Sequence, residues 1–284
     1  LLMTESPVLY LALSLTAAAF VAFGLIVGIL VNILADDLPH YRRPRLPRYP
    51  DGTPRPFIAW SGLLAFLTGK RASVNGARLS WRYPLAEIAT IALMVVVVAA
   101  TANQPRVNDL QRLFYLAYVS ICVLITVIDI EHRLILFSVI VPSSALALLG
   151  AALTPAGGRP TLEEALVGAA LGFGVFFVLY LGGILFSYVA AKARGQELPE
   201  VAFGYGDVML AALSGLILGW QALIFAMFIT VFLGALGAFI FLVGRALTGR
   251  YDMFTALPYG PYIVAGTLIM LLFSDQVRTA LGRF

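Results

Sequence analysis

The chain has 284 residues, of which 61% are hydrophobic and only 12% are charged, and its mean hydropathy is +0.93. Soluble domains are roughly 45–50% apolar and about 25% charged, so the composition excludes an ordinary soluble protein and predicts an all-α polytopic membrane protein. A single cysteine, Cys122, excludes an internal disulfide and a zinc site built from cysteines alone.

The apolar runs predict the membrane-spanning helices, each of which needs about 20 residues, with a range of roughly 17–25. In chain order we expect eight helices, at residues 8–34, 85–102, 111–129, 134–153, 163–190, 207–220, 221–244 and 258–274. The first run exceeds the roughly 7–15 apolar residues of a signal peptide, so we expect it to remain as a helix. Only Gly219, Trp220 and Gln221 separate the sixth helix from the seventh, which leaves one long kinked helix as an alternative.

The charged loops orient these helices. Residues 35–84, between the first and second helices, hold nine of the nineteen lysines and arginines, and this predicts a basic cytoplasmic loop. Its prolines, five of them between residues 40 and 56, predict an extended surface loop that lies on anionic lipid headgroups. Because the basic residues cluster in a loop between spans, the sequence pI of about 9.3 does not indicate nucleic-acid binding.

Alternation of the spans then assigns the remaining loops. The segments Lys192–Glu200 and Arg245–Asp252 are expected at the cytoplasmic face, and both chain ends at the opposite face. The same alternation places two acidic residues, Asp129 and Asp207, at the cytoplasmic rim of two different helices.

These two aspartates are the main candidates for chemistry. Asp207 follows Gly204-Tyr205-Gly206 at the start of an apolar run, and Asp129 ends another. A charged side chain at a hydrocarbon boundary is costly and usually functional, and glycines allow close approach of backbone or substrate. Two carboxylates that share one proton can hydrolyse a peptide bond, as in aspartic proteases. A helix-capping role for Asp207 is the alternative.

Other polar residues near the spans are weaker candidates. Glu163 and Glu164 suit capping of a helix start, Glu87 an ion pair or a helix start, and Glu131 points away from Asp129 on a helix. The histidines, His40 and His132, lack the spacing of a zinc protease. Ser187 and Ser214 are expected to bond helix carbonyls.

Five segments, in order along the chain, resemble motifs of the type IV prepilin peptidases, which are bacterial membrane aspartic proteases of the GxGD class. They are Gly28–Asn32, Ser80–Glu87, Ile128–Ile135, Phe203–Leu210 and Leu257–Tyr262. The resemblance implies that Asp129 and Asp207 are the catalytic pair. It also implies that Gly204, Gly206, Pro258, Gly260 and Pro261 shape the approach to the scissile bond.

By this resemblance, the substrate is a type IV prepilin or pseudopilin, whose short basic leader is removed at the cytoplasmic face of the bacterial inner membrane. Proteolysis needs no cofactor and no metal. Residues 1–84 would form the first span with its loop, which is the region linked to N-methylation in the family, and residues 85–284 the peptidase domain. The methylation would use S-adenosylmethionine.

The chain departs from the family pattern at several positions. The four-cysteine zinc site that many members carry in the first loop is absent, since this loop has no cysteine. The family's Pro-Asp after the first aspartate is Leu136-Phe137 here, and a frequent lysine is Met209. These differences leave both aspartates in place, but they leave methylation open.

Two other hypotheses remain. One is another GxGD intramembrane protease, of the preflagellin or presenilin kind; Ile128 before Asp129, in place of tyrosine, speaks against the presenilin class. The other is a membrane transporter or assembly subunit whose carboxylates bind protons or cations without catalysis.

Overall fold

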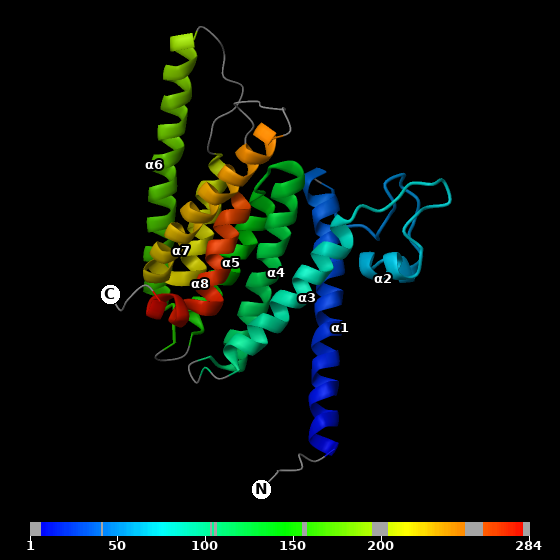
Figure 1. Cartoon of the computed structure of the whole chain (residues 1–284). Helices are drawn as coiled ribbons and strands as arrows, with labels where there is room; N and C mark the ends of the chain where they lie inside the picture. Colours follow the sequence, from blue (N-terminus) through cyan, green and yellow to red (C-terminus); the bar gives the residue numbers. More distant parts are fainter. Residues whose placement is uncertain are drawn as a thin grey trace. The chain divides into compact units, whose positions relative to one another are not determined.

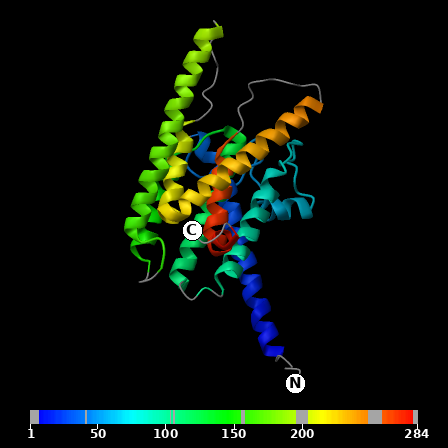
Figure 2. The same ribbon diagram turned by 60° about the vertical axis from the view of Figure 1, so that its left-hand side comes forward.

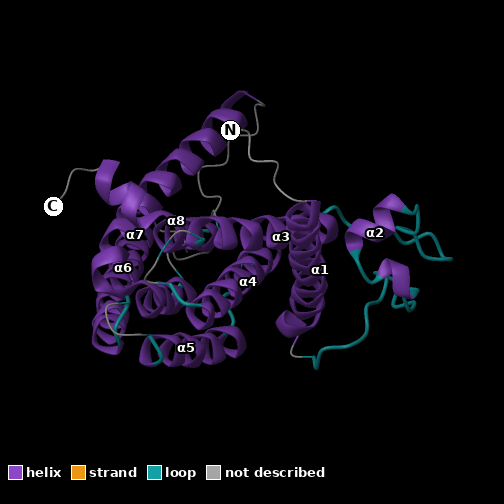
Figure 3. Ribbon diagram, turned by 90° about the horizontal axis from the view of Figure 1, so that it is seen from below, coloured by secondary structure: helices purple, strands orange, loops and turns teal. Residues whose placement is uncertain are grey.

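The computed structural model describes residues 7–40, 42–102, 104, 107–154, 158–194, 204–247 and 258–280. Within these residues the regular secondary structure is helical, with loops between the helices, two isolated β-bridges and no strand (Figure 3). The helices are α1 (Pro7–Asp37), η1 (Leu38–His40), η2 (Phe57–Ala59), α2 (Gly62–Leu67), α3 (Arg82–Thr101), α4 (Asp109–His132), α5 (Phe137–Ala152), α6 (Leu162–Arg194), α7 (Tyr205–Leu247) and α8 (Gly260–Ala280).

The predicted class, an all-α polytopic membrane protein, is confirmed. Six helices of the described chain are long and apolar enough to cross a bilayer, and α5 is a shorter apolar helix of 16 residues (Figure 1). The number of crossings, predicted as eight, stays a prediction.

The chain forms two compact units. The first contains residues 1–103 together with the middle of α4, residues 119–127, and the second contains residues 104–118 and 128–284. The functional division expected at residue 84 concerns activity and stays a prediction.

Helix ends differ from the predicted ends where local backbone geometry decides them. The fourth predicted helix, at 134–153, begins only at Phe137. The reason is that α4 continues to His132, past the expected end at residue 129, and stops at Arg133, which adopts a left-handed conformation with φ 53°. Residues 133–136 therefore form a connecting loop.

Parts of two predicted cytoplasmic loops lie outside the described residues, namely 195–200 and 248–252. The same is true of Phe203 and Leu257 in the quoted motifs.

Helix α7 turns back on itself at Gly219, which resolves the predicted ambiguity in favour of two helical segments. Gly219 has φ 72° and ψ 164°, a conformation that glycine adopts readily. The missing Cβ of Gly172 in α6 would touch both Ala211 and Leu223, twelve residues apart in α7. A straight helix would separate those two by about 18 Å. Figure 2 shows the yellow first segment and the orange second segment running in different directions.

Small residues bring α6 and the first segment of α7 into backbone contact. A Cβ added at Gly168 would collide with the carbonyl oxygen of Gly215, and one added at Gly215 would collide with that of Gly168. In lipid, such close contact replaces the hydrophobic drive of water-soluble packing. The first α7 segment also bonds α8, since Thr267 Oγ1 donates to Ser214 Oγ at 2.8 Å.

In the first unit, α1 and α3 pack through Gly28, whose missing Cβ would lie 2.9 Å from Glu87 Cα. The Glu87 side chain is fully buried and accepts hydrogen bonds from Asn32 Nδ2, Ser61 Oγ, and the backbone N–H groups of Gly62 and Leu63. The expected ion pair or start-of-helix role in its own helix is therefore wrong. Glu87 instead caps the N-terminus of α2, a short helix that the sequence reading did not predict.

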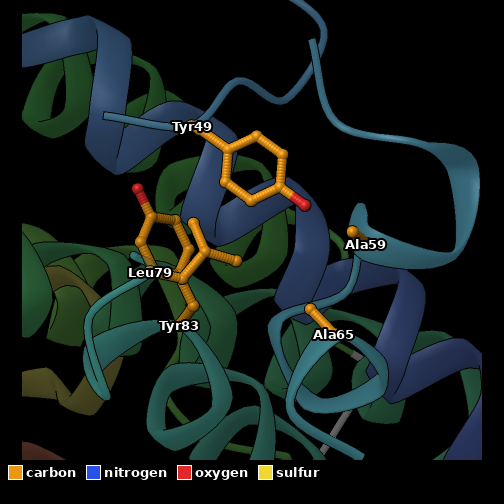
Figure 4. Close-up of a cluster of buried hydrophobic side chains, with 5 residues drawn as sticks. All are labelled: Tyr49, Ala59, Ala65, Leu79 and Tyr83. Atoms are coloured by element: carbon orange, nitrogen blue, oxygen red, sulfur yellow. The ribbon is translucent and has the colours of Figure 1, made fainter. Parts of the chain in front are cut away.

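The proline-rich loop has a small core of its own. The side chains of Tyr49, Ala59, Ala65, Leu79 and Tyr83 are buried together (Figure 4). The guanidinium of Arg55, 5% exposed, lies 4.2 Å from the centre of the Tyr83 ring. The segment is thus a folded module rather than simply the extended surface loop that we expected.

Candidate active site

Asp129 lies in the last turn of α4, one turn before the helix ends. The backbone N–H of Arg133 donates to Asp129 O at 2.8 Å and closes that turn. Asp129 is only 5% exposed, so it is buried within the second unit rather than exposed at the end of its helix. Its Oδ2 atom has no well-aligned hydrogen-bond donor among the described residues, although the backbone N–H of Gly260 lies beside the carboxylate. Such an incompletely satisfied buried carboxylate is uncommon.

Asp207 lies in the first turn of α7 and is partly buried. The backbone N–H of Gly204 donates to Asp207 Oδ2 at 3.2 Å, and the N–H of Asp207 donates to Gly204 O at 3.1 Å. This reciprocal pattern caps the helix start, as the alternative reading of the sequence expected. Capping occupies one carboxylate oxygen and is compatible with chemistry at the other.

The two aspartates are close enough to interact electrostatically. Both belong to the second unit, and the end of α4 and the start of α7 lie at the same end of it in Figure 1. The start of α8 joins them, since the backbone amide of Gly260 lies beside the Asp129 carboxylate. Three chain segments thus bring two carboxylates together.

Two glycines make this approach possible by packing against Ile135 and Asp129. A Cβ at Gly206 would lie 2.8 Å from Ile135 Cβ, and a Cβ at Gly260 would collide with Asp129 Oδ2. The same Cβ at Gly260 would lie 3.5 Å from Ile135 Cδ1. The loop residue Ile135 therefore touches the helix starts that carry both glycines.

The other predicted residues lie at the starts of α7 and α8. Among the described residues, only atoms of its own turn lie within 4 Å of a Cβ placed at Gly204, which is exposed. Pro258 precedes the helix start, and Pro261 lies in the first turn of α8, where its missing N–H costs no helix bond. Tyr259 closes that turn, because its carbonyl accepts from the N–H of Tyr262 at 3.0 Å.

The sequence reading missed two neighbours of the aspartates, Ile135 and Tyr259. The Tyr259 ring packs near Phe176, at 6.5 Å between centroids, and its hydroxyl is within electrostatic range of Asp207. Both residues lie inside quoted motifs, which was the available signal, but nothing local showed what they would touch.

The weaker candidates do not join the site. Glu164 forms a capping box with Thr161, as expected: the N–H of Thr161 donates to Glu164 Oε2 at 3.0 Å, and the N–H of Glu164 to Thr161 Oγ1 at 3.2 Å. Ser214 Oγ donates to the Leu210 carbonyl at 2.9 Å, also as expected. Glu131 is exposed, whereas Asp129 is buried.

The family's zinc site does not fit this chain. The loop between α1 and α3 has no cysteine, and the described residues contain no group of three His, Cys, Asp or Glu side chains that could hold a metal ion. The Arg55 and Glu87 contacts organise the loop with protein groups instead.

The comparisons with known proteins agree with the motif resemblance. The model of the type IV leader peptidase family matches residues 116–239, a range that contains both aspartates. A protein named prepilin leader peptidase/N-methyltransferase from Aeromonas salmonicida is 32% identical over 78% of this chain and 67% of its own length. Its namesake in Bacillus subtilis is 30% identical over 76% of each chain.

A third protein of that name, from Stutzerimonas stutzeri, is 28% identical over 81% of this chain and 70% of its own. No solved structure matches the chain. The similarity spans both units, and the chain belongs to the type IV leader peptidase family.

Proposed function

We propose that this protein is a membrane aspartic endopeptidase that removes the short basic leader from type IV prepilin-like precursors, with Asp129 and Asp207 as its catalytic pair. The observation that carries the proposal is the electrostatic interaction between a buried carboxylate at the end of α4 and a second, partly buried carboxylate at the start of α7. The names of the curated relatives supply the substrate class.

In this mechanism the two carboxylates share one proton and act as a unit. The ionised member takes a proton from water, which attacks the scissile carbonyl. The protonated member polarises that carbonyl and later helps to pass a proton to the leaving amine. The exposed backbone of Gly204 would let an extended substrate segment approach the pair, while Gly206 and Gly260 allow Ile135 and Asp129 to pack closely at the two helix starts.

The expected location is the bacterial inner membrane with the aspartates at the cytoplasmic face. The support is the concentration of nine of nineteen cations in the loop before α3, together with the alternation of spans. The precursor's basic leader would then stay in the cytosol, while its apolar stem lies in the bilayer beside the enzyme.

A cleavage assay with the purified protein and a type IV prepilin tests the catalytic pair. Asp129→Ala and Asp207→Ala should each lower the rate by roughly 10⁴-fold, because the carboxylates act as a unit. Glu163→Ala, which removes an exposed acid from the start of α6, is the matched control. Full activity in either aspartate variant would refute the pair. If a contaminating protease in the preparation accounted for that cleavage, the same result would favour the transporter hypothesis.

A second candidate activity is N-methylation of the new N-terminus with S-adenosylmethionine, which the names of the relatives favour. The buried core of the loop provides a folded region for it without cysteines. Mass spectrometry of the cleaved pilin, with and without S-adenosylmethionine, tests this activity. An unmodified N-terminus under both conditions would restrict the protein to proteolysis.

A further inference from the structure

A polar cavity of about 310 Å³ lies within the second unit, away from the aspartates. Its walls come from the start of α4, the segment before α6, the Gly219 turn of α7 and the end of α8. One wall residue, Gln111, precedes Asp129 by 18 positions in α4, which corresponds to roughly 27 Å along the helix. The cavity is therefore distinct from the candidate active site.

Two residues that line this cavity carry polar atoms without a hydrogen-bond partner among the described residues. Gln111 is 6% exposed, and its Nε2 donates to the Arg159 carbonyl at 3.1 Å, but its Oε1 has no donor among the described residues. Arg278 Nε is buried and has no hydrogen-bond acceptor among the described residues. Because buried polar groups are nearly always paired, an occupant that supplies both a donor and an acceptor is implied.

The charges of the wall are balanced. The wall contains two arginines, Arg159 and Arg278, and two acids, Glu164 and Asp275, and Arg159 Nε lies 3.7 Å from Glu164 Oε1. An occupant that is neutral overall, but carries both a positive and a negative group, matches this wall better than a simple anion.

The start of the second α7 segment also favours a negatively charged group in the cavity. The first residues of the second α7 segment, Trp220 to Ala222, line the cavity directly after the Gly219 turn. Backbone N–H groups at such a helix start favour a phosphate or carboxylate. The start of α6 is not available for this role, because the Thr161 and Glu164 capping box already occupies it.

The cavity also lies where apolar spans end. It touches the first turns of α4 and the last turns of α8, and Trp220, 38% exposed, marks the α7 turn beside it. Tryptophan is enriched at the depth of lipid headgroups. The space far exceeds the roughly 10–15 Å³ that one water needs, so a headgroup can enter it.

We propose that this cavity binds the headgroup of a zwitterionic phospholipid of the phosphatidylethanolamine type. The phosphate accepts from Arg278 and faces the start of the second α7 segment. The ammonium donates to Gln111 Oε1 and pairs with Asp275.

The test measures binding of defined lipids to the full-length, delipidated protein by native mass spectrometry and by the shift in unfolding temperature. Phosphatidylcholine is the matched probe, because its methylated ammonium has no N–H to donate. We expect phosphatidylethanolamine to bind about tenfold more tightly than phosphatidylcholine. Arg278→Gln should weaken phosphatidylethanolamine binding about tenfold, and Gln111→Met should remove the preference between the two lipids.

Arg112→Gln is the control variant, since Arg112 follows Gln111 in α4 but lies outside the cavity wall. Its lipid binding should equal that of the wild type. If Arg278→Gln lowers the unfolding temperature without lipid, Arg278→Lys serves instead: it keeps the charge and loses the Nε donor. That variant should bind phosphatidylethanolamine more weakly than the wild type does.

Equal binding of the two lipids by the wild type would overturn the proposal, as would tighter binding of phosphatidylglycerol, which is anionic. Unchanged binding in the folded arginine variants would also overturn it. If soluble phosphoethanolamine competes with an affinity equal to that of the lipid, the headgroup chemistry is supported and the ligand is a soluble molecule. If inorganic phosphate alone competes equally well, the proposal is contradicted, because the ammonium group then contributes nothing. Prepilin cleavage should persist in all these variants, so the outcome is independent of the proposed peptidase activity.

Discussion

At the scale of single residues, the candidate site depends on the absence of side chains as much as on the two carboxylates. Gly260 touches Asp129 Oδ2 and Ile135, while Gly206 touches Ile135 from the start of α7. A methyl group at either glycine would need space that these atoms already fill. The glycines therefore control how closely three chain segments approach.

Gly260→Ala should lower prepilin cleavage about hundredfold, because moving a catalytic group by about 1 Å can cost that much. The added Cβ would displace the Asp129 carboxylate. Steady-state cleavage rates and the unfolding temperature are the measurements. Gly174→Ala in α6 is the control, since no atom of the described residues lies within 4 Å of its added Cβ. Wild-type activity in Gly260→Ala would show that this contact does not position Asp129.

Asp51 in the first loop provides a residue-scale prediction about pH. Hydrogen bonds from Ser73 and Thr53 lower the pKa of Asp51 from 3.8 to about 2. A carboxyl with a lowered pKa stabilises the folded loop above its unfolded pKa, and this contribution is lost as the pH falls from about 4 to about 2.

Cleavage of the loop by pepsin between pH 4 and pH 2 measures this effect. The wild-type loop should become more susceptible as the pH falls through this window, while Asp51→Asn should already be susceptible at pH 4. Asp109→Asn, at the start of α4, is the control and should behave as the wild type does. A wild-type loop whose susceptibility stays constant over the window would contradict the prediction.

At the scale of elements, the contact between α6 and α7 should be the least tolerant of larger side chains. Gly215→Val should destabilise the protein by about 1–3 kcal/mol, which is the usual cost of overpacking. The reason is that its Cβ meets the Gly168 carbonyl. Unfolding of the detergent-solubilised protein measures the loss, with Gly174→Val as the control. Equal stability of the two variants would show that α6 and α7 can separate at no cost.

The elements also show which features a sequence can predict. Long apolar runs predicted the long apolar helices, and acids at the ends of such runs predicted Asp129 and Asp207 as candidates, because these signals are local. Glu87 was misread because its donors, Ser61 and Gly62, lie 26 and 25 residues earlier in the chain. The six-residue helix that it caps has no span-like signal. Contacts of Ile135 depend on three segments meeting in space, which no local pattern encodes.

At the scale of the whole molecule, loop charge and the turn of α7 together make a prediction about topology. Single cysteines, introduced after Cys122→Ala, can be labelled from either side of membrane vesicles with an impermeant reagent. Val74 and Leu134 are 96% and 46% exposed, and Trp220 is 38% exposed. Val74→Cys and Leu134→Cys should react from the cytoplasmic side, since the basic loop is expected there.

Trp220→Cys and Asp109→Cys should react only from the opposite side. Trp220 lies at the α7 turn, so it is separated from Asp207 by one crossing, and Asp109 begins the helix that ends near Asp129. Labelling of Trp220→Cys and Leu134→Cys from the same side would mean that the first α7 segment does not cross the bilayer. Labelling of Val74→Cys from the outside would instead mean that the protein has the opposite orientation in the membrane. The aspartates would then face away from the cytosol, where the basic leader of a precursor is expected to remain.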